Sequence, residues 1–226
     1  MPNAGNEAAW VELFNGRDFT GWHARGDQAQ HEWLAAGQVS LKPDDDTHFA
    51  IEPGQGLMVN GASGRTADLI TDASFGDCEA HIEFVVPKGS NSGVYFMSHY
   101  EIQVFDSWGV KEPTYSDCGG IYCQWINEQA VGGQAPRTNA CKAPGEWQTY
   151  DVIFRAPRFD EKGNKIRNAL FVKVVHNGVV IHENVEVGGP TRASVPGPER
   201  ATGPLMVQGD HGPVAYRNVR IRPLKP

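Results

Sequence analysis

Three short segments of the chain carry polar and aromatic side chains at the two-residue spacing of a β-strand. They place four side chains on polar faces: Tyr95, Glu101, Gln103 and Gln208. Alternate residues of a strand share one face of its sheet. Carboxylates and amides exchange hydrogen bonds with hydroxyl groups, and aromatic rings pack against the C–H faces of sugars. The pattern indicates a sugar-binding sheet face. The simpler interpretation is a solvated face on which Glu101 is an ordinary surface acid.

A histidine follows the third of these segments. His211 comes after Gln208-Gly209-Asp210, in a glycine-flanked loop at the end of an expected strand. Such loops often carry functional residues, and histidine can act as base, acid or metal ligand near neutral pH. The alternative is a loop histidine that bonds to the backbone. We give Asp210 little weight as its orienting partner, because adjacent residues of a strand point to opposite faces.

The segment 78–86 offers two further titratable side chains. Glu83 and His81 alternate there with the apolar residues Ile82 and Phe84. We expect this strand to neighbour that of Glu101 and to present the two side chains on the same face. They are secondary candidates for the site.

Composition excludes several classes of function. The 226 residues include 27 Asp and Glu against 20 Lys and Arg, a net charge of −7. This balance argues against binding to nucleic acid or to an anionic membrane. The sequence has no run of about 18 apolar residues, so it predicts no transmembrane helix. The sequence also lacks a phosphate-binding glycine loop, a serine nucleophile elbow and a zinc-protease helix.

The chain has four cysteines, which leave three interpretations open. Three of them, Cys118, Cys123 and Cys141, fall close together, and Cys78 lies apart. They could be buried free thiols, or two of the group of three could form a disulfide in an oxidising compartment. A zinc site is the weakest option, because the spacing lacks a C-x2-C pair.

The segments that position these residues are short and alternating, which predicts an all-β protein. The clear strand candidates are 78–86, 93–98, 100–105, 148–155, 168–176, 179–183, 204–208 and 214–222, with weaker ones at 32–41 and 56–60. Many short strands without a βαβ rhythm favour a sandwich or barrel. The segment 106–147 is long and irregular, and 188–203 reads as a loop. A structured insertion as long as the first is usually functional or disulfide-held.

The first nine residues are polar and small, without the basic start and apolar core of a signal peptide. Two interpretations follow. The protein is cytosolic, or the sequence begins after a signal that has been removed.

Six motifs in order resemble those of the 3-keto-disaccharide hydrolase family. They are Leu13-Phe14-Asn15-Gly16 with Thr20-Gly21-Trp22, Asn91–Asp106, Gly120-Ile121-Tyr122, Gly145–Asp151, His176-Asn177-Gly178 and Gly203–Ile221. The resemblance covers about residues 10–224. No single motif is diagnostic, but their order and spacing together indicate the family.

The resemblance implies a single domain over residues 1–226 with a concanavalin A-like jelly roll of two antiparallel sheets. It implies activity on 3-keto sugars, a bacterial source and a location in the periplasm or outside the cell. The strand of Trp22 and the strand Tyr216–Ile221 should share one sheet. Met97 is a departure, because relatives often carry an arginine there that could bind a hydroxyl or pair with Glu101.

The chemistry of a 3-keto glycoside assigns roles to these residues. The ketone at C3 acidifies the C2 proton, the group on C1 can leave by elimination, and water can add to the resulting enone. This needs a base near C2, an acid at the glycosidic oxygen and a group that stabilises charge on O3. We expect Glu101 and His211 to be the catalytic pair, or to ligate a divalent cation, without an organic cofactor. The expected substrate-binding residues are Gln103, Tyr95, Gln208, Tyr122 and Glu83.

Two rival functions use the same fold. A carbohydrate-binding, lectin-like module would keep the amide and aromatic face without needing an acid–base pair. An ordinary endo-glucanase would place acidic residues along one strand as E-x-D-x-x-E, a pattern that Gln103 breaks after Glu101. The partner expected in each case is a carbohydrate, with no nucleic acid and no membrane insertion.

Overall fold

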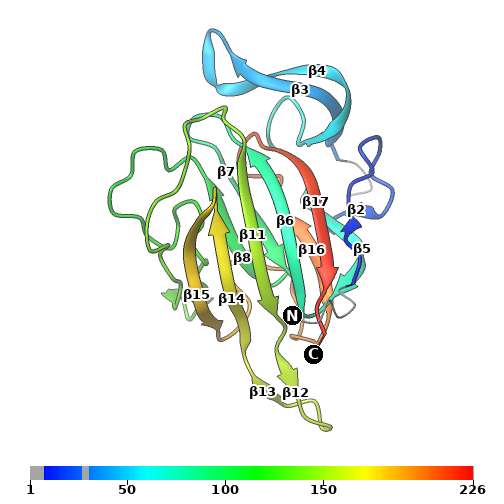
Figure 1. Cartoon of the computed structure of the whole chain (residues 1–226), viewed down its shortest axis with the longest axis vertical. Coiled ribbons are helices and arrows are strands. Elements are labelled where there is room, and N and C mark those ends of the chain that lie inside the picture. Colours follow the sequence, from blue (N-terminus) through cyan, green and yellow to red (C-terminus); the bar gives the residue numbers. More distant parts are fainter. Residues whose placement is uncertain (1–7, 27–30, 226) are drawn as a thin grey trace, which may run out of the picture.

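The structure is a computed structural model, and it describes residues 8–26 and 31–225. Two antiparallel sheets pack face to face (Figure 1). The larger sheet runs in the order β15 (Val179–Val187), β14 (Ala169–His176), β11 (Gln148–Arg155), β6 (Cys78–Val85), β17 (Ala215–Pro223), β4 (Asp45–Val59) and β3 (Leu34–Lys42), and β1 (Val11–Glu12) pairs with β17. The smaller sheet runs β2 (Trp22–Ala24), β5 (Leu69–Phe75), β16 (Gly203–Val207), β7 (Asn91–Phe96) and β8 (Tyr100–Phe105).

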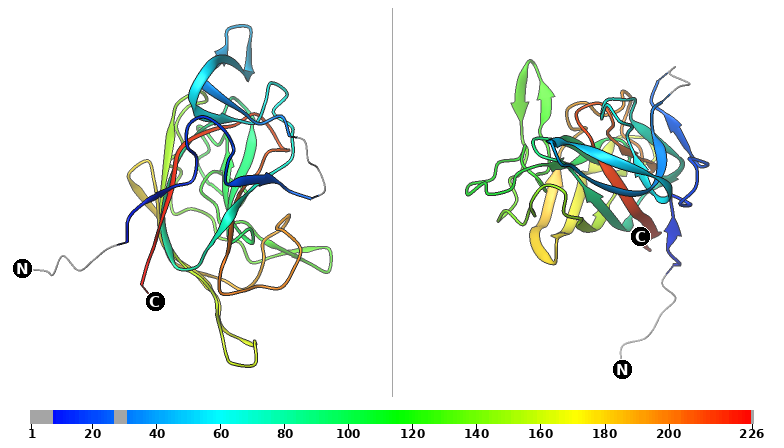
Figure 2. Two further views of the ribbon diagram at one scale, coloured as in Figure 1. Left: turned by 90° about the vertical axis from the view of Figure 1, so that its right-hand side faces the viewer. Right: turned by 90° about the horizontal axis from the view of Figure 1, so that it is seen from above.

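The predicted all-β jelly-roll sandwich is confirmed. The described residues form no α-helix, and all the strand pairs given for them are antiparallel. None of the described segments is a helix long and apolar enough to span a membrane. Two short hairpins complete the set: β9 (Gln124–Ile126) with β10 (Gln129–Val131), and β12 (Arg158–Phe159) with β13 (Lys165–Arg167). In Figure 2 the β9–β10 hairpin (green) stands away from the body.

Aromatic side chains join the two sheets in the core. Phe154 of β11 packs against Phe96 of β7, with ring centroids 5.2 Å apart, and against Tyr100 of β8 at 5.7 Å. Phe171 of β14 meets Phe96 edge to face at 5.5 Å. All four rings are at most 1 % exposed. Because β7 and β8 each place alternate residues inward, the residues between them must point away from the core.

Two strand predictions need correction. The Trp22 strand, β2, pairs with β5 in the smaller sheet, whereas the chain end β17 lies in the larger sheet and pairs with β1. Strand β5 was not predicted, although it lies between β2 and β16. Its first three residues are all buried and its next three are all exposed, so its sequence has no two-residue alternation to mark it as a strand.

All four cysteines are buried free thiols in this structure. The Sγ atom of Cys118 lies 3.2 Å from the hydroxyl of Tyr150, and that hydroxyl donates to the carbonyl of Gln103 at 2.7 Å. The segment 106–147 is therefore tied to β8 by packing and hydrogen bonds. Isolated bridges between Ile121 and both Ile102 and Gln134 strengthen this attachment.

Candidate functional site

The candidate site lies on the outer face of the smaller sheet. In the β7–β8 hairpin, Tyr95 pairs with Glu101 and Gly93 pairs with Gln103. The hairpin turns at Met97 and Ser98, whose φ values of 55° and 54° place both in the left-handed region. On the other side of β7, the backbone N–H of Gln208 donates to the backbone carbonyl of Gly93 at 2.9 Å. The register therefore brings three predicted residues, Glu101, Gln103 and Gln208, together with Tyr95.

These side chains surround a cavity of about 390 Å³, which we call the Glu101 cavity. Six of the predicted site residues line it: Tyr95, Glu101, Gln103, Tyr122, Gln208 and His211. Three further lining residues were not predicted: Asn91, Arg192 and Ala193. The lining is polar and aromatic, and the volume lies within the range of small-molecule sites.

Glu101 is a buried carboxyl group with no cation paired to it among the described residues. Its side chain and backbone are together only 3 % exposed, and burial raises its pKa to about 8. The nearby Tyr95 hydroxyl opposes this rise in pKa, while the negative charge of Asp68 adds to it. A carboxyl group with such a pKa can take up or release a proton near neutral pH, as general acid–base catalysis requires.

Gly93 creates the space in which this carboxylate lies. A Cβ atom at residue 93 would stand 2.3 Å from Oε1 of Glu101 and 3.0 Å from the ring of Tyr95. Such distances are far below van der Waals contact, so a larger residue would displace the carboxylate. The glycine is therefore needed here for room and not for its backbone angles.

Two amide oxygens of the cavity have no hydrogen-bond partner among the described residues. They are Oε1 of Gln103 and Oδ1 of Asn91, and both are buried. The Gln103 nitrogen is already engaged, because it donates to the carbonyl of Ser116 at 3.2 Å. An unpaired buried acceptor costs roughly 1–3 kcal/mol. Two of them in one cavity favour a ligand that supplies hydroxyl donors.

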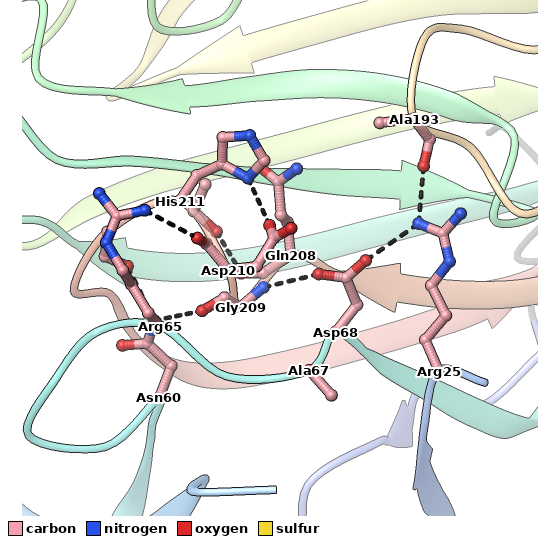
Figure 3. A network of polar contacts seen from close by, with 12 residues as sticks. Arg25, Asn60, Arg65, Ala67, Asp68, Ala193, Gln208, Gly209, Asp210 and His211 are labelled. Atoms are coloured by element: carbon pink, nitrogen blue, oxygen red, sulfur yellow. Dashed lines mark hydrogen bonds and ion pairs between the residues drawn. The ribbon is translucent and has the colours of Figure 1, made fainter. Parts of the chain in front are cut away.

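His211 lines the cavity and lies beside Asp210 (Figure 3). Its Nδ1 atom is bonded to Oδ1 of Asp210, and this contact raises the pKa of the imidazole. The prediction that Asp210 would not orient His211 was therefore wrong. Both residues lie in an irregular loop after β16, so the strand alternation that separates neighbouring side chains does not apply.

A partly buried ion pair between Arg25 and Asp68 supports that loop. Oδ1 of Asp68 accepts the amide of Gly209 at 2.9 Å, and Oδ2 accepts Nη1 of Arg25 at 3.1 Å (Figure 3). Burial raises the pKa of Asp68 in spite of these bonds. Arg25 also donates to the carbonyls of Ala193 and Ser194, at 2.7 and 2.8 Å. The network connects the His211 loop to residues 188–202.

Arg192 enters the cavity from residues 188–202. Its amide donates to the carbonyl of Cys123 at 2.8 Å, and its guanidinium lies 4.1 Å from the ring centroid of Trp125. Tyr122 comes from the 106–147 insertion, and its amide donates to the carbonyl of Glu101 at 3.1 Å. Sequence patterns missed Arg192 because a loop has no periodicity that assigns its side chains to a face. The length of the loop was the available signal.

Two expectations about the site are wrong. Glu83 and His81 do not share a face with Glu101, because β6 lies in the larger sheet. They occupy its outer face, where Glu83 pairs with Arg217 at 2.6 Å and His81 with Asp151 at 2.6 Å. Met97, where relatives often carry an arginine, lies in the hairpin turn and packs with the core. The cationic residue that lines the Glu101 cavity is Arg192.

The expected divalent cation meets few ligands here. Across the described part of the chain, no three or more His, Cys, Asp or Glu side chains gather to hold a metal ion. In the cavity only Glu101 and His211 belong to these types. This pair falls short of the three or four protein ligands of a zinc centre.

The sandwich fold and the polar cavity on a sheet face define a carbohydrate-related protein. The family model of the 3-keto-alpha-glucoside-1,2-lyase-like domain matches residues 9–222. The chain belongs to this family.

Solved structures agree with this assignment. A crystal structure from Parabacteroides distasonis ATCC 8503, described as a "putative glycosyl hydrolase", has 28% sequence identity and a TM-score of 0.69, covering 95% of this chain and 84% of that chain. A second structure with the same description and source has 19% identity and a TM-score of 0.58, covering 96% of this chain and 94% of the other, and shows the shared fold alone. No curated protein matches the chain. Family and neighbours together support a glycoside-acting enzyme.

Proposed function

We propose that this protein cleaves 3-keto-α-glucosides by removing the proton on C2 and expelling the group on C1, after which water adds to the enone. One observation carries the proposal: a buried carboxyl group, Glu101, with its pKa raised to about 8, lies in a polar cavity that His211 also lines. A carboxylate with a high pKa is a strong base for a C–H proton made acidic by a neighbouring ketone.

The residues that line the cavity supply a base, a cation that stabilises the enolate and a proton donor. Glu101 takes the C2 proton, and the electron pair forms the enolate on C2, C3 and O3. Arg192 lines the same cavity, and its guanidinium stabilises the negative charge on O3. The imidazolium of His211, favoured by Asp210, gives its proton to the glycosidic oxygen as the C1–O bond breaks. Water then adds to C1, and C2 regains a proton.

The amide side chains hold the sugar in place. Oε1 of Gln103 and Oδ1 of Asn91 accept hydrogen bonds from ring hydroxyls. Gln208 and Tyr122 also line the cavity and provide further polar and aromatic contacts. Orientation of this kind places C2 beside the carboxylate, which lowers the entropic part of the barrier.

The test uses a methyl 3-keto-α-glucoside and its unoxidised parent, each with and without EDTA. We expect methanol to be released from the keto sugar alone, and deuterium to enter C2 of the product when the reaction runs in D2O. EDTA should leave the rate unchanged. Loss of activity with EDTA would show that a metal ion takes part.

Other outcomes contradict the proposal. Release from the unoxidised parent would identify an ordinary glycosidase. Binding of sugar by calorimetry with no release from either compound would identify a carbohydrate-binding module.

A further inference from the structure

The β9–β10 hairpin carries exposed apolar side chains that the packing of the two sheets does not explain. Trp125, Ile126 and Val131 are all exposed, and Trp125 leaves 48 % of its surface open to solvent. The hairpin stands away from the body of the protein (Figure 2), and none of the three side chains belongs to the core between the sheets. Trp125 instead contacts a residue of the Glu101 cavity.

The ring of Trp125 faces the side chain of Arg192. The guanidinium carbon of Arg192 lies 4.1 Å from the centroid of that ring. At this distance a guanidinium group is attracted to the electron-rich face of an aromatic ring, and tryptophan makes the strongest contact of this kind. The hairpin is therefore linked to the cationic residue that lines the cavity.

The backbone of Arg192 is held on two sides, but its guanidinium is not. The backbone N–H donates to the carbonyl of Cys123 at 2.8 Å, and the Tyr95 hydroxyl donates to the carbonyl of Arg192 at 3.4 Å. In the described part of the chain the guanidinium makes no hydrogen bond or ion pair, whereas it does contact Trp125. The ring therefore restrains a long side chain that would otherwise sample many rotamers.

Strand β9 fits closely against the loop that carries Arg192. A Cβ atom added to Gly189 would stand 2.5 Å from Oε1 of Gln124, so this loop passes next to the Gln124 side chain. Cys123, Gln124 and Trp125 are consecutive, and each contacts residues 188–192. The hairpin is thus anchored on the loop, as an element that orients one of its side chains must be.

A guanidinium that is fixed in advance stabilises a developing charge better than one that must first be ordered. Preorganised groups need no rearrangement at the moment of reaction. In the proposed reaction the charge on O3 develops as Glu101 takes the C2 proton. Loss of the restraint on Arg192 should therefore lower kcat and leave KM almost unchanged, because the contact strengthens only in the transition state.

We propose that Trp125 is a positioning residue for this reaction. Its ring holds the Arg192 guanidinium in the position from which it acts on O3, so that the exposed β9–β10 hairpin sets the rate without contacting the reacting atoms. This rests on the proposed function, because the action of Arg192 on O3 is part of it.

The test measures kcat and KM for methyl 3-keto-α-glucoside. Trp125→Leu keeps an apolar side chain but removes the aromatic face, and we expect kcat to fall about tenfold with KM changed less than twofold. Trp125→Phe keeps an aromatic face and should retain at least a third of the native kcat. Trp108→Leu is the matched control, because it removes another exposed tryptophan that does not line the cavity. Native kcat in Trp125→Leu, or equal losses in Trp125→Leu and Trp125→Phe, would overturn the proposal.

A second variant shows whether Trp125 acts through Arg192. In the Arg192→Ala protein, the further substitution Trp125→Leu should leave kcat unchanged, because no guanidinium is left to orient. Non-additive effects of this kind identify residues that act as one unit. A further tenfold loss would mean that Trp125 acts on another group, and would overturn the positioning role.

Chemical modification separates this proposal from the proposed function, because it needs no turnover. Phenylglyoxal reacts with accessible guanidinium groups, and peptide mass spectrometry can follow Arg192 beside the exposed Arg167 of β13 in one sample. Relative to Arg167, Arg192 should react at least threefold faster in Trp125→Leu than in the native protein or in Trp125→Phe. An unchanged ratio would overturn the positioning role even if keto sugars are cleaved. A native protein that cleaves no keto sugar would overturn the proposed function, and this ratio would still decide whether Trp125 restrains Arg192.

Discussion

Glu101 is held by the fold in a state that is unfavourable for an isolated carboxylate. Its surroundings contain a tyrosine hydroxyl, a second carboxyl group at Asp68 and apolar core, but no paired cation among the described residues. Desolvation raises the pKa of a carboxyl group because it penalises the charged form. A buried group with a perturbed pKa in a cavity is typical of a catalytic residue.

The substitution Glu101→Gln should abolish catalysis without unfolding the protein, and it should change how folding stability depends on pH. We expect turnover of a 3-keto glucoside to fall at least a thousandfold, since the amide cannot accept the C2 proton. The folded carboxyl group keeps its proton between its usual pKa near 4.5 and about pH 8, while the unfolded chain loses it. Native stability therefore falls as pH rises through this window, by roughly 1.4 kcal/mol for each unit of pKa difference.

Thermal unfolding at pH 5 and pH 8 provides the measurement for stability. The amide variant should lack this loss between the two pH values and should be the more stable protein at pH 8. Full turnover by the variant would exclude Glu101 as the base. An identical pH dependence of Tm in both proteins would contradict the raised pKa.

The pH dependence of the reaction tests the same group in the active protein. We expect kcat/KM to rise with pH up to about 8, because Glu101 must lose its proton to act as base. Tyr95 and Asp68 act on this group directly, and His211, whose own pKa is raised, limits the rate on the alkaline side. Asp68→Asn should shift the acidic limb to lower pH, since it removes a negative charge that raises the pKa of Glu101. If the acidic limb of the kcat/KM profile does not move in Asp68→Asn, a group other than Glu101 sets that limb.

At the level of elements, the β7–β8 hairpin positions the base. Its two-residue alternation sends Tyr100, Ile102 and Val104 into the core and leaves Glu101 and Gln103 on the outer face. Burial of these outer residues comes from the loops that cover them. Thr191 of residues 188–202 accepts the amide of Glu101 at 3.2 Å and donates to the carbonyl of His99 at 3.0 Å.

Gly93→Ala tests whether the β7–β8 hairpin must leave room for the Glu101 carboxylate. The added Cβ would meet Oε1 of Glu101 at 2.3 Å, so the carboxylate must move. We expect kcat to fall about a hundredfold and stability to fall by ~1–3 kcal/mol, as in other overpacked sites. Circular dichroism should show an unchanged sheet content. Gly188→Ala is the matched control, because a Cβ added there would meet only Nε2 of Gln124, at 3.5 Å. Native kcat in Gly93→Ala would mean that the observed position of the carboxylate is not the active one.

At the scale of the whole molecule, the core between the sheets holds the site face in place. The ring centroid of Phe154 lies 5.1 Å from that of Phe171 within the larger sheet. The Phe154 ring also contacts Phe96 and Tyr100 of the smaller sheet. It therefore carries much of the contact beneath the β7–β8 hairpin. Aromatic pairs of this kind add stability beyond the area that they bury.

Phe154→Ala should destabilise the protein by ~3–5 kcal/mol, because the cavity left behind cannot collapse between two sheets. The measurement is urea unfolding followed by tryptophan fluorescence. Ile166→Ala, at an exposed position of β13, is the control and should cost much less. A loss below about 1 kcal/mol for Phe154→Ala would show that the sheets are held together elsewhere.

The sequence alone determined which residues face the core on most strands and which polar residues accompany them. Alternation over 100–105 placed Glu101 with Gln103, because a strand has a period of two whatever its partners are. The ordered motifs also indicated the family, whose model matches residues 9–222.

Only the tertiary structure decided which strands share a sheet. Alternation assigns a side chain to a face but does not say which strand lies next to it, so Glu83 was wrongly placed beside Glu101. The structure also brought in Arg192, Asn91 and Asp68, which come from three separate segments. Local propensity cannot specify such meetings, because they depend on how loops of no fixed period close over the sheet.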